Sequence, residues 1–219
     1  MPVRRKVLQF VALVTLAISW PQAFLAEPFK LLAFGDSLVQ GYGLPPNEGL
    51  VPQMQNWLVE RGYDVEIINA GVAGDTTAAA LQRIDWALSP EVDAAFVLLG
   101  GNDVLRGYDP SSTREYLGSI LARLGLEGLP VLLAGIAAPG NYGADYQVAF
   151  QSIYVDLSNE YGTLLYPNFF SVLLNMEDRD EVLRSFYQPD GLHPNRAGVG
   201  LIVEDLGPMM IQLLEAGNQ

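Results

Sequence analysis

The chain has 219 residues, of which 50% are apolar, and its formal net charge is −13. This length and composition fit one domain with a large buried core. The excess of acidic residues argues against nucleic acid as a partner, because a negative chain repels phosphate. The absence of cysteine excludes disulfides, a thiol nucleophile and cysteine-bound metal. With a single histidine, a zinc site would need mostly carboxylate ligands, which is atypical.

The first 26 residues have the pattern of a signal peptide. Basic residues at positions 4–6 precede an apolar run over residues 7–18, and Ala23 and Ala26 are small residues suited to a cleavage site. Because a membrane span needs roughly 20 apolar residues, we expect cleavage and a periplasmic or secreted protein; an uncleaved anchor is the alternative. The remaining chain would carry nine basic and 25 acidic residues, a net charge of −16, and no stable membrane span.

Beyond residue 26, short apolar runs alternate with longer amphipathic segments. We predict strands over residues 30–34, 65–68, 94–99, 131–134 and 164–165. We predict helices over residues 50–61, 76–88, 112–124, 144–161 and 195–214. Fully apolar strands that alternate with amphipathic helices are typical of a parallel sheet covered on both faces. Residues 27–219 are therefore predicted to form a single doubly wound α/β domain with a sheet of about five strands.

Polar, glycine-rich turns follow the first three predicted strands, and a similar turn precedes the last helix. They read GDSL from Gly35, NAGVAGDT from Asn69, GGND from Gly100 and DGLHP from Asp190. In doubly wound sheets, ligands bind beyond the carboxyl ends of the strands. We therefore expect these turns to open on one edge of the sheet and to carry the functional residues.

A serine, a histidine and an aspartate in these turns supply the groups that acyl transfer needs. Ser37 is a candidate nucleophile on a tight strand-to-helix turn, where Gly35 allows a sharp bend. His193 is the only imidazole base in the chain, and Asp190, three residues earlier, can orient its ring. Each has a plainer interpretation, since Ser37 could cap the next helix and a lone histidine could be structural. Their combination favours catalysis.

The same turns offer donors for the negative charge that develops in acyl transfer. Asn102 can contribute its side-chain amide, Gly74 its backbone N–H, and Ser37 its own backbone N–H. Alternatively, Gly74 is an ordinary turn glycine and Asn102 bonds its own backbone. We predict an oxyanion hole formed by Ser37, Gly74 and Asn102.

Three aspartates, Asp36, Asp75 and Asp103, also follow the strands. Such a set could bind Mg²⁺ for phosphoryl transfer, but no Gly-Lys-Ser/Thr loop is present to hold a phosphate. We expect no metal, and we expect these aspartates to hydrogen-bond the loops of the site in place. The Gly-x-Ser-x-Gly elbow is absent, so the chain is not a standard α/β-hydrolase.

The order and spacing of the four turns resemble the four sequence blocks of the SGNH, or GDSL, hydrolase family, from about residue 30 to the C-terminus. The resemblance implies a flavodoxin-like three-layer α/β/α sandwich, with Ser37, Asp190 and His193 as the catalytic triad. It implies the oxyanion donors given above, and a periplasmic or secreted enzyme that uses no metal or cofactor.

Two stretches, GGNDVLRGYDP from Gly100 and PGNYGADY from Pro139, are similar to the bacterial thioesterase I, lysophospholipase and arylesterase group of that family. In that group the second stretch is a mobile loop beside the acyl pocket, which implies substrate-loop roles for Pro139, Asn141 and Tyr142. The segment over residues 166–188 departs from the family pattern. Its large apolar side chains would either line an acyl site or pack in the core: Phe169, Phe170, Leu173, Leu174 and Met176.

The expected function is hydrolysis of carboxylic esters and thioesters through an acyl-enzyme on Ser37. Acyl-CoA, lysophospholipids and aryl esters are the substrate types that the resemblance implies. We expect the protein to be a monomer. A carbohydrate O-acetyl esterase would use the same groups and is the alternative enzyme. A non-catalytic periplasmic binding protein is the alternative outside catalysis.

Overall fold

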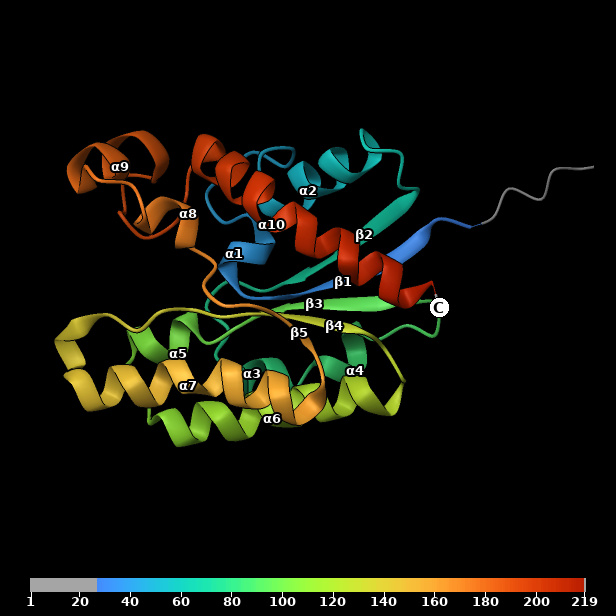
Figure 1. Ribbon diagram of the computed structural model, residues 1–219, viewed down its shortest axis with the longest axis horizontal. Helices are drawn as coiled ribbons and strands as arrows, with labels where there is room; N and C mark the ends of the chain where they lie inside the picture. Colours follow the sequence, from blue (N-terminus) through green and yellow to red (C-terminus); the bar gives the residue numbers. More distant parts are fainter. Residues whose placement is uncertain (1–26, 219) are drawn as a thin grey trace, which may run out of the picture.

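The computed structural model describes residues 27–218, and the predicted signal peptide lies outside this range, so export of the protein stays a prediction. A five-stranded, all-parallel sheet forms the centre of the fold (Figure 1), with the strand order β2-β1-β3-β4-β5. The strands are β1 (Phe29–Gly35), β2 (Val65–Gly71), β3 (Ala94–Leu98), β4 (Val131–Ala134) and β5 (Leu164–Tyr166). The predicted α/β class, sheet and strand number are confirmed.

Helices cover both faces of this sheet and complete the three layers (Figure 1). One face carries α1 (Ser37–Gln40), α2 (Leu50–Val59), α8 (Ser171–Leu174), α9 (Arg179–Phe186) and α10 (Arg196–Gly217). The other carries α3 (Thr77–Leu81), α4 (Ile84–Ala87), α5 (Gly101–Leu105), α6 (Pro110–Leu126) and α7 (Ala144–Tyr161), which the 3₁₀ turn η1 (Gly140–Tyr142) precedes.

The central strands are buried along their length because helices cover both of their sides. Every residue of β3 and β4 is buried, and so are the last five residues of β1. The edge strand β2 instead alternates between buried and exposed positions at its start. Continuous apolar runs are therefore found where two layers of helix exclude water, as expected for a parallel sheet.

Helix α10 is the one helix in the described range that is long and apolar enough, by length and composition, to cross a membrane. Half of its most apolar window is buried inside the fold. It packs on α2 so closely that a Cβ atom at Gly207 would lie 2.4 Å from the Trp57 ring. In this structure α10 is a packed helix of the three-layer core.

The helix predicted over residues 76–88 is instead two short helices, α3 and α4. The break falls at Arg83, whose φ of −120° and ψ of 4° lie outside helical values. Its guanidinium donates to the carbonyls of Gly35 and Ala70, at 2.8 and 2.9 Å. These bonds hold Arg83 against the ends of β1 and β2, which explains why a helical sequence pattern is interrupted here.

The strand order places a topological switch point between β1 and β3. Strand β1 lies between β2 and β3, and the chain leaves β1 toward one face but leaves β3 toward the other (Figure 1). Ligands in such folds bind in the crevice where the direction of winding reverses. Ser37 follows β1 and Asn102 follows β3, so two predicted site residues lie at this crevice.

Candidate active site

Ser37 is presented by a sharp turn between β1 and α1. Asp36 caps α1, and its Oδ1 accepts a hydrogen bond from the Leu38 N–H at 3.0 Å. A Cβ atom at Gly35 would lie 2.6 Å from the carbonyl oxygen of Leu98, so only glycine fits where the chain leaves the sheet. The turn therefore has the tight geometry that the sequence predicted for a nucleophile.

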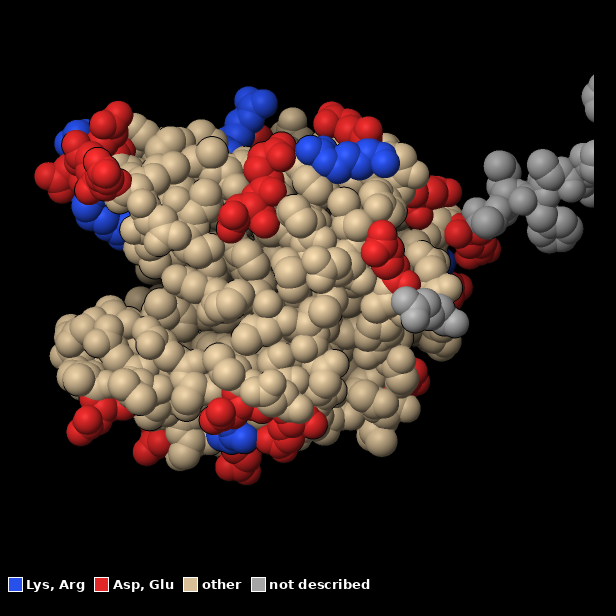
Figure 2. Space-filling view, in the orientation of Figure 1, with Lys and Arg blue, Asp and Glu red and all other residues tan. Residues whose placement is uncertain are grey.

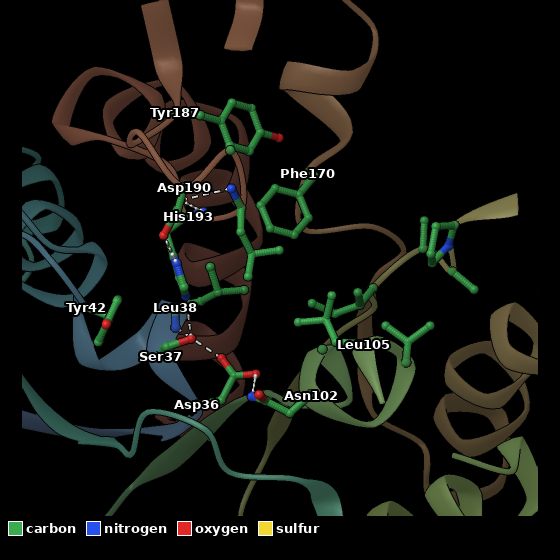
Figure 3. A pocket seen from close by; sticks show the side chains of 18 of the residues that line it. Asp36, Ser37, Leu38, Tyr42, Asn102, Leu105, Phe170, Tyr187, Asp190 and His193 are labelled. Carbon is green, nitrogen blue, oxygen red and sulfur yellow. Dashed lines mark hydrogen bonds and ion pairs between the residues drawn. The ribbon is translucent and has the colours of Figure 1, made fainter. Parts of the chain in front are cut away.

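A chain of hydrogen bonds connects Ser37 to His193 and Asp190 (Figure 3). The Oγ atom of Ser37 lies 2.9 Å from Nε2 of His193, and Nδ1 of His193 lies 2.7 Å from Oδ2 of Asp190. A carboxylate accepts only, so Nδ1 carries the proton and the Nε2 lone pair faces the serine hydroxyl. Ser37 and His193 are 156 positions apart in sequence, yet their reactive atoms meet.

Asp190 also holds the backbone of its own loop. Its Oδ1 accepts the N–H groups of Leu192 and His193 at 2.9 and 3.0 Å. Partial burial opposes ionisation of this carboxyl, but the hydrogen bonds from His193 outweigh it and keep the pKa of Asp190 below its ordinary value. The carboxylate is thus charged at neutral pH and able to stabilise a protonated imidazole.

Two residues that sequence reasoning missed support the histidine loop. The Gln188 N–H donates to the carbonyl of His193, and its Nε2 donates to the carbonyl of Tyr42, both at 2.8 Å. The Tyr42 ring lies against the imidazole, with centroids 5.0 Å apart. Gln188 and Tyr42 are 146 positions apart, so no local pattern could have revealed this contact.

The three predicted oxyanion donors, Ser37, Gly74 and Asn102, line one cavity. Gly74 has a φ of 84°, a left-handed conformation that favours glycine. The guanidinium of Arg106 donates to the Gly74 carbonyl at 3.0 Å and fixes that peptide from the side of α5. Asn102 lies on α5 itself, and its amide reaches toward Asp36 (Figure 3).

The aspartates that follow the strands hydrogen-bond the loops of the site, as the sequence predicted. Asp75 forms a 2.6 Å ion pair with Arg83. The buried Asp103 accepts from the backbone N–H and the hydroxyl of Thr77, at 2.9 and 2.6 Å. Within residues 27–218, no group of three or more histidine or acidic side chains is arranged to hold a metal ion.

A cavity of about 770 Å³ opens beside Ser37 and reaches the surface as a cleft. Figure 2 shows this cleft as the notch at the left edge of the molecule, and Arg179 of α9 belongs to its lining. Its walls are mainly apolar: Leu38, Val104, Leu105, Ile136, Ala138, Pro139, Phe170, Leu174, Tyr187 and Leu192. A cavity of this size and lining is typical of a small-molecule site.

The apolar residues of the segment over positions 166–188 divide between the two roles considered for them. Phe169 and Leu173 are only 2% and 0% exposed and belong to the core. Phe170 and Leu174 line the cavity, whereas Met176 packs against the core from its edge. Adjacent residues on the short helix α8 thus face different surroundings.

The predicted substrate loop contributes unevenly to the cavity. Pro139 lines it, but Asn141 and Tyr142 do not belong to its lining. The Tyr142 hydroxyl instead donates to the carbonyl of Leu105 at 3.2 Å, behind the cavity wall. In this structure, Tyr142 therefore supports α5, and of the three predicted loop residues only Pro139 lines the cavity.

Comparisons with known proteins agree with this fold. The model of the GDSL-like Lipase/Acylhydrolase family matches residues 33–201, which span all four turns. The chain belongs to this family and is a carboxylic ester hydrolase.

Similar proteins include Esterase TesA of Pseudomonas aeruginosa, 36% identical over 84% of this chain and 89% of the relative. Thioesterase 1/protease 1/lysophospholipase L1 of Escherichia coli is 35% identical over 76% of each chain. The crystal structure of TesA superposes with a TM-score of 0.76, covering 84% of this chain and 99% of that one, at 34% identity. The esterase AlinE4 superposes with a TM-score of 0.70 at 40% identity, covering 86% and 97%.

Proposed function

We propose that this protein hydrolyses carboxylic esters and thioesters with medium or long acyl chains, through an acyl-enzyme on Ser37. The observation that carries the proposal is the hydrogen-bond chain from Ser37 through His193 to Asp190, placed at the wall of a large apolar cavity. A nucleophile, an oriented base and an acyl-sized space are thereby combined at one position.

Each residue has a defined part in the proposed reaction. His193 accepts the Ser37 proton at Nε2 as Oγ attacks the acyl carbon, and Asp190 stabilises the imidazolium. The oxyanion receives hydrogen bonds from the N–H groups of Ser37 and Gly74 and from the amide of Asn102. His193 then protonates the leaving alcohol or thiol. Water, activated by the same imidazole, attacks the acyl-enzyme and releases the acid.

The cavity supports longer acyl chains over acetyl. Its apolar walls extend from Leu38 beside the nucleophile to Leu174 on α8, and an acetyl group would leave most of this space unfilled. The relatives described as esterases and as thioesterase/lysophospholipase also support ester and thioester substrates. A carbohydrate O-acetyl esterase remains the alternative that a substrate series can separate.

The test is hydrolysis of p-nitrophenyl esters from acetyl to dodecanoyl by the wild type and by S37A. We expect kcat/KM to peak above acetyl, and S37A to lose at least about 10³-fold in kcat because the nucleophile is missing. Ser152, exposed on α7, provides the matched control, and S152A should retain full activity.

Labelling with a fluorophosphonate probe separates the remaining alternatives. The wild type and S152A should be labelled, and folded S37A should not. Full activity in S37A would overturn the serine mechanism, and folded wild type that reacts with no probe would favour a binding protein. A steep preference for acetyl esters would favour the O-acetyl esterase.

A further inference from the structure

Asp36 is a buried carboxylate that the serine, histidine and aspartate chemistry does not use. It is only 1% exposed, and it lies between Ser37 and Asn102 (Figure 3). Its two oxygens have separate partners. Oδ1 accepts from the Leu38 N–H at 3.0 Å, and Oδ2 accepts from Nδ2 of Asn102 at 3.3 Å. Asp36 thus joins the nucleophile turn after β1 to the oxyanion donor after β3.

The hydrogen bond from Asn102 to Asp36 determines which end of the Asn102 amide faces Asp36. The two ends of an asparagine amide differ, since the nitrogen donates and the oxygen accepts. An ionised carboxylate can only accept, so it pairs with the nitrogen end and repels the oxygen end. Oδ2 lies close to the backbone of Gly101, since a Cβ atom there would be 3.2 Å from it, and Asp36 as a whole is only 1% exposed. The orientation of the Asn102 amide therefore depends on whether Asp36 is ionised.

We propose that Asp36 is a positioning residue whose ionised carboxylate fixes the amide of Asn102 so that an N–H faces the oxyanion. The proposal rests on the proposed function, in which Asn102 is an oxyanion donor. The Asn102 nitrogen has two N–H groups, of which one binds Asp36 and the other is free for the substrate. A protonated Asp36 can donate to the amide oxygen, which permits the reversed amide and turns a lone pair toward the negative charge.

Charged and titratable groups around Asp36 affect this balance. Burial raises its pKa to about 6, against the hydrogen bonds from Leu38 and Asn102. His193 lowers the pKa and Asp75 raises it, and the buried Tyr154 lies on the α7 side. The carboxylate is therefore the main form at neutral pH, and acid converts it to the form that permits a reversed amide.

The variant D36N tests this inference with little change in shape. Its Oδ1 can still accept from the Leu38 N–H, but an NH₂ group replaces the oxygen that faces Asn102. We expect kcat for p-nitrophenyl butyrate to fall about 10²-fold with little change in KM, because one oxyanion donor is misdirected. Circular dichroism and fluorophosphonate labelling verify that D36N is folded with a competent Ser37.

A double-mutant cycle with N102A separates positioning from a general structural role. N102A alone should lose about 10²- to 10³-fold in kcat. In that background, D36N should cost less than about 3-fold, since no amide remains to be directed. Equal losses from D36N in both backgrounds would overturn the proposal. Loss of function in S37A is measured separately, so failure of the proposed serine mechanism is distinguishable.

A second measurement does not depend on the folding of D36N. The acid limb of the kcat–pH profile should contain two ionisations in the wild type and one fewer in N102A, where the state of Asp36 no longer directs a donor. Identical acid limbs in the two proteins would contradict the proposal.

Discussion

The two carboxylates of the site, Asp36 and Asp190, lie in opposite environments. Asp36 is buried between strand ends and is 1% exposed, and burial raises its pKa to about 6. The side chain of Asp190 is 40% exposed in the loop before α10, and the hydrogen bonds from His193 outweigh partial burial and lower its pKa. The surroundings of Asp36 therefore disfavour its ionised form, and the surroundings of Asp190 favour its ionised form.

This difference fixes how each region responds to pH. The folded-state pKa of Asp36 exceeds its ordinary value of 3.8, so the fold favours the protonated carboxyl. The free energy of unfolding therefore falls as pH rises from about 4 to about 6 and Asp36 ionises. The pKa of Asp190 is depressed, so its contribution is present above its ordinary value and is lost as pH falls. An ionised Asp36 thus opposes stability at neutral pH, as is common for groups retained for function.

Neutralising Asp190 should have the largest effect on activity. In D190N, an amide nitrogen would face Nδ1 of His193, which favours the tautomer with a proton on Nε2 and removes the base from Ser37. We expect kcat to fall about 10³- to 10⁴-fold, measured with p-nitrophenyl butyrate at pH 8.

The matched control for D190N is D64N, which removes the same charge from an exposed residue just before β2, at the far end of the sheet. D64N should retain wild-type kcat. A loss of less than about 10-fold in D190N would show that its carboxylate does not orient the imidazole.

Neutralising Asp36 should instead increase stability while activity falls. Because the pKa of Asp36 is raised to about 6, removing its charge should raise the free energy of unfolding by up to about 3 kcal/mol above pH 7. Urea unfolding of D36N and wild type from pH 4.5 to 8 would measure this difference. We expect D36N to be the more stable protein at pH 8, with the advantage shrinking toward pH 4.5.

The same D64N control should follow the wild-type dependence of stability on pH. If D36N is less stable than wild type at every pH by a constant amount, burial does not oppose the charge of Asp36. Asp36 and Asp190 would then not differ in how their surroundings affect the free energy of ionisation.

The sequence predicted the sheet and the meeting of Ser37, Gly74 and Asn102 at one cavity because both depend on simple rules. Buried parallel strands are apolar at every position, and strand ends of one sheet share an edge. Arg83 shows where such rules fail. It lies within a helical pattern, but its guanidinium binds carbonyls at the ends of two strands, and a long-range contact of this kind breaks the helix.

The histidine side of the site depends more on contacts between distant segments, and less of it could be predicted. Gln188 joins this loop to Tyr42, which no periodicity or motif indicates. The short helix α8 is only four residues long, too short for a helical period to show which residues face inward. The sequence therefore left open which apolar residues after position 166 pack in the core.

Two neighbouring leucines on α8, Leu173 and Leu174, also lie in opposite environments. Leu174 is 45% exposed and lines the cavity, whereas Leu173 is fully buried. In L174A, lost contact with the acyl chain should lower the ratio of kcat/KM for octanoyl over acetyl esters by about 3- to 10-fold, or about 1 kcal/mol. Stability should change by less than about 0.5 kcal/mol, because little buried area is lost.

L173A is the internal control, and it should show the reverse pattern. A cavity in the core should lower the free energy of unfolding by about 2–5 kcal/mol, while the octanoyl-to-acetyl ratio stays at the wild-type value in folded protein. Ester panels and urea unfolding of both variants give the two readouts. If L174A leaves the ratio unchanged, the acyl chain does not reach α8. The chain would then contact other residues of the lining, such as Ile136 and Pro139.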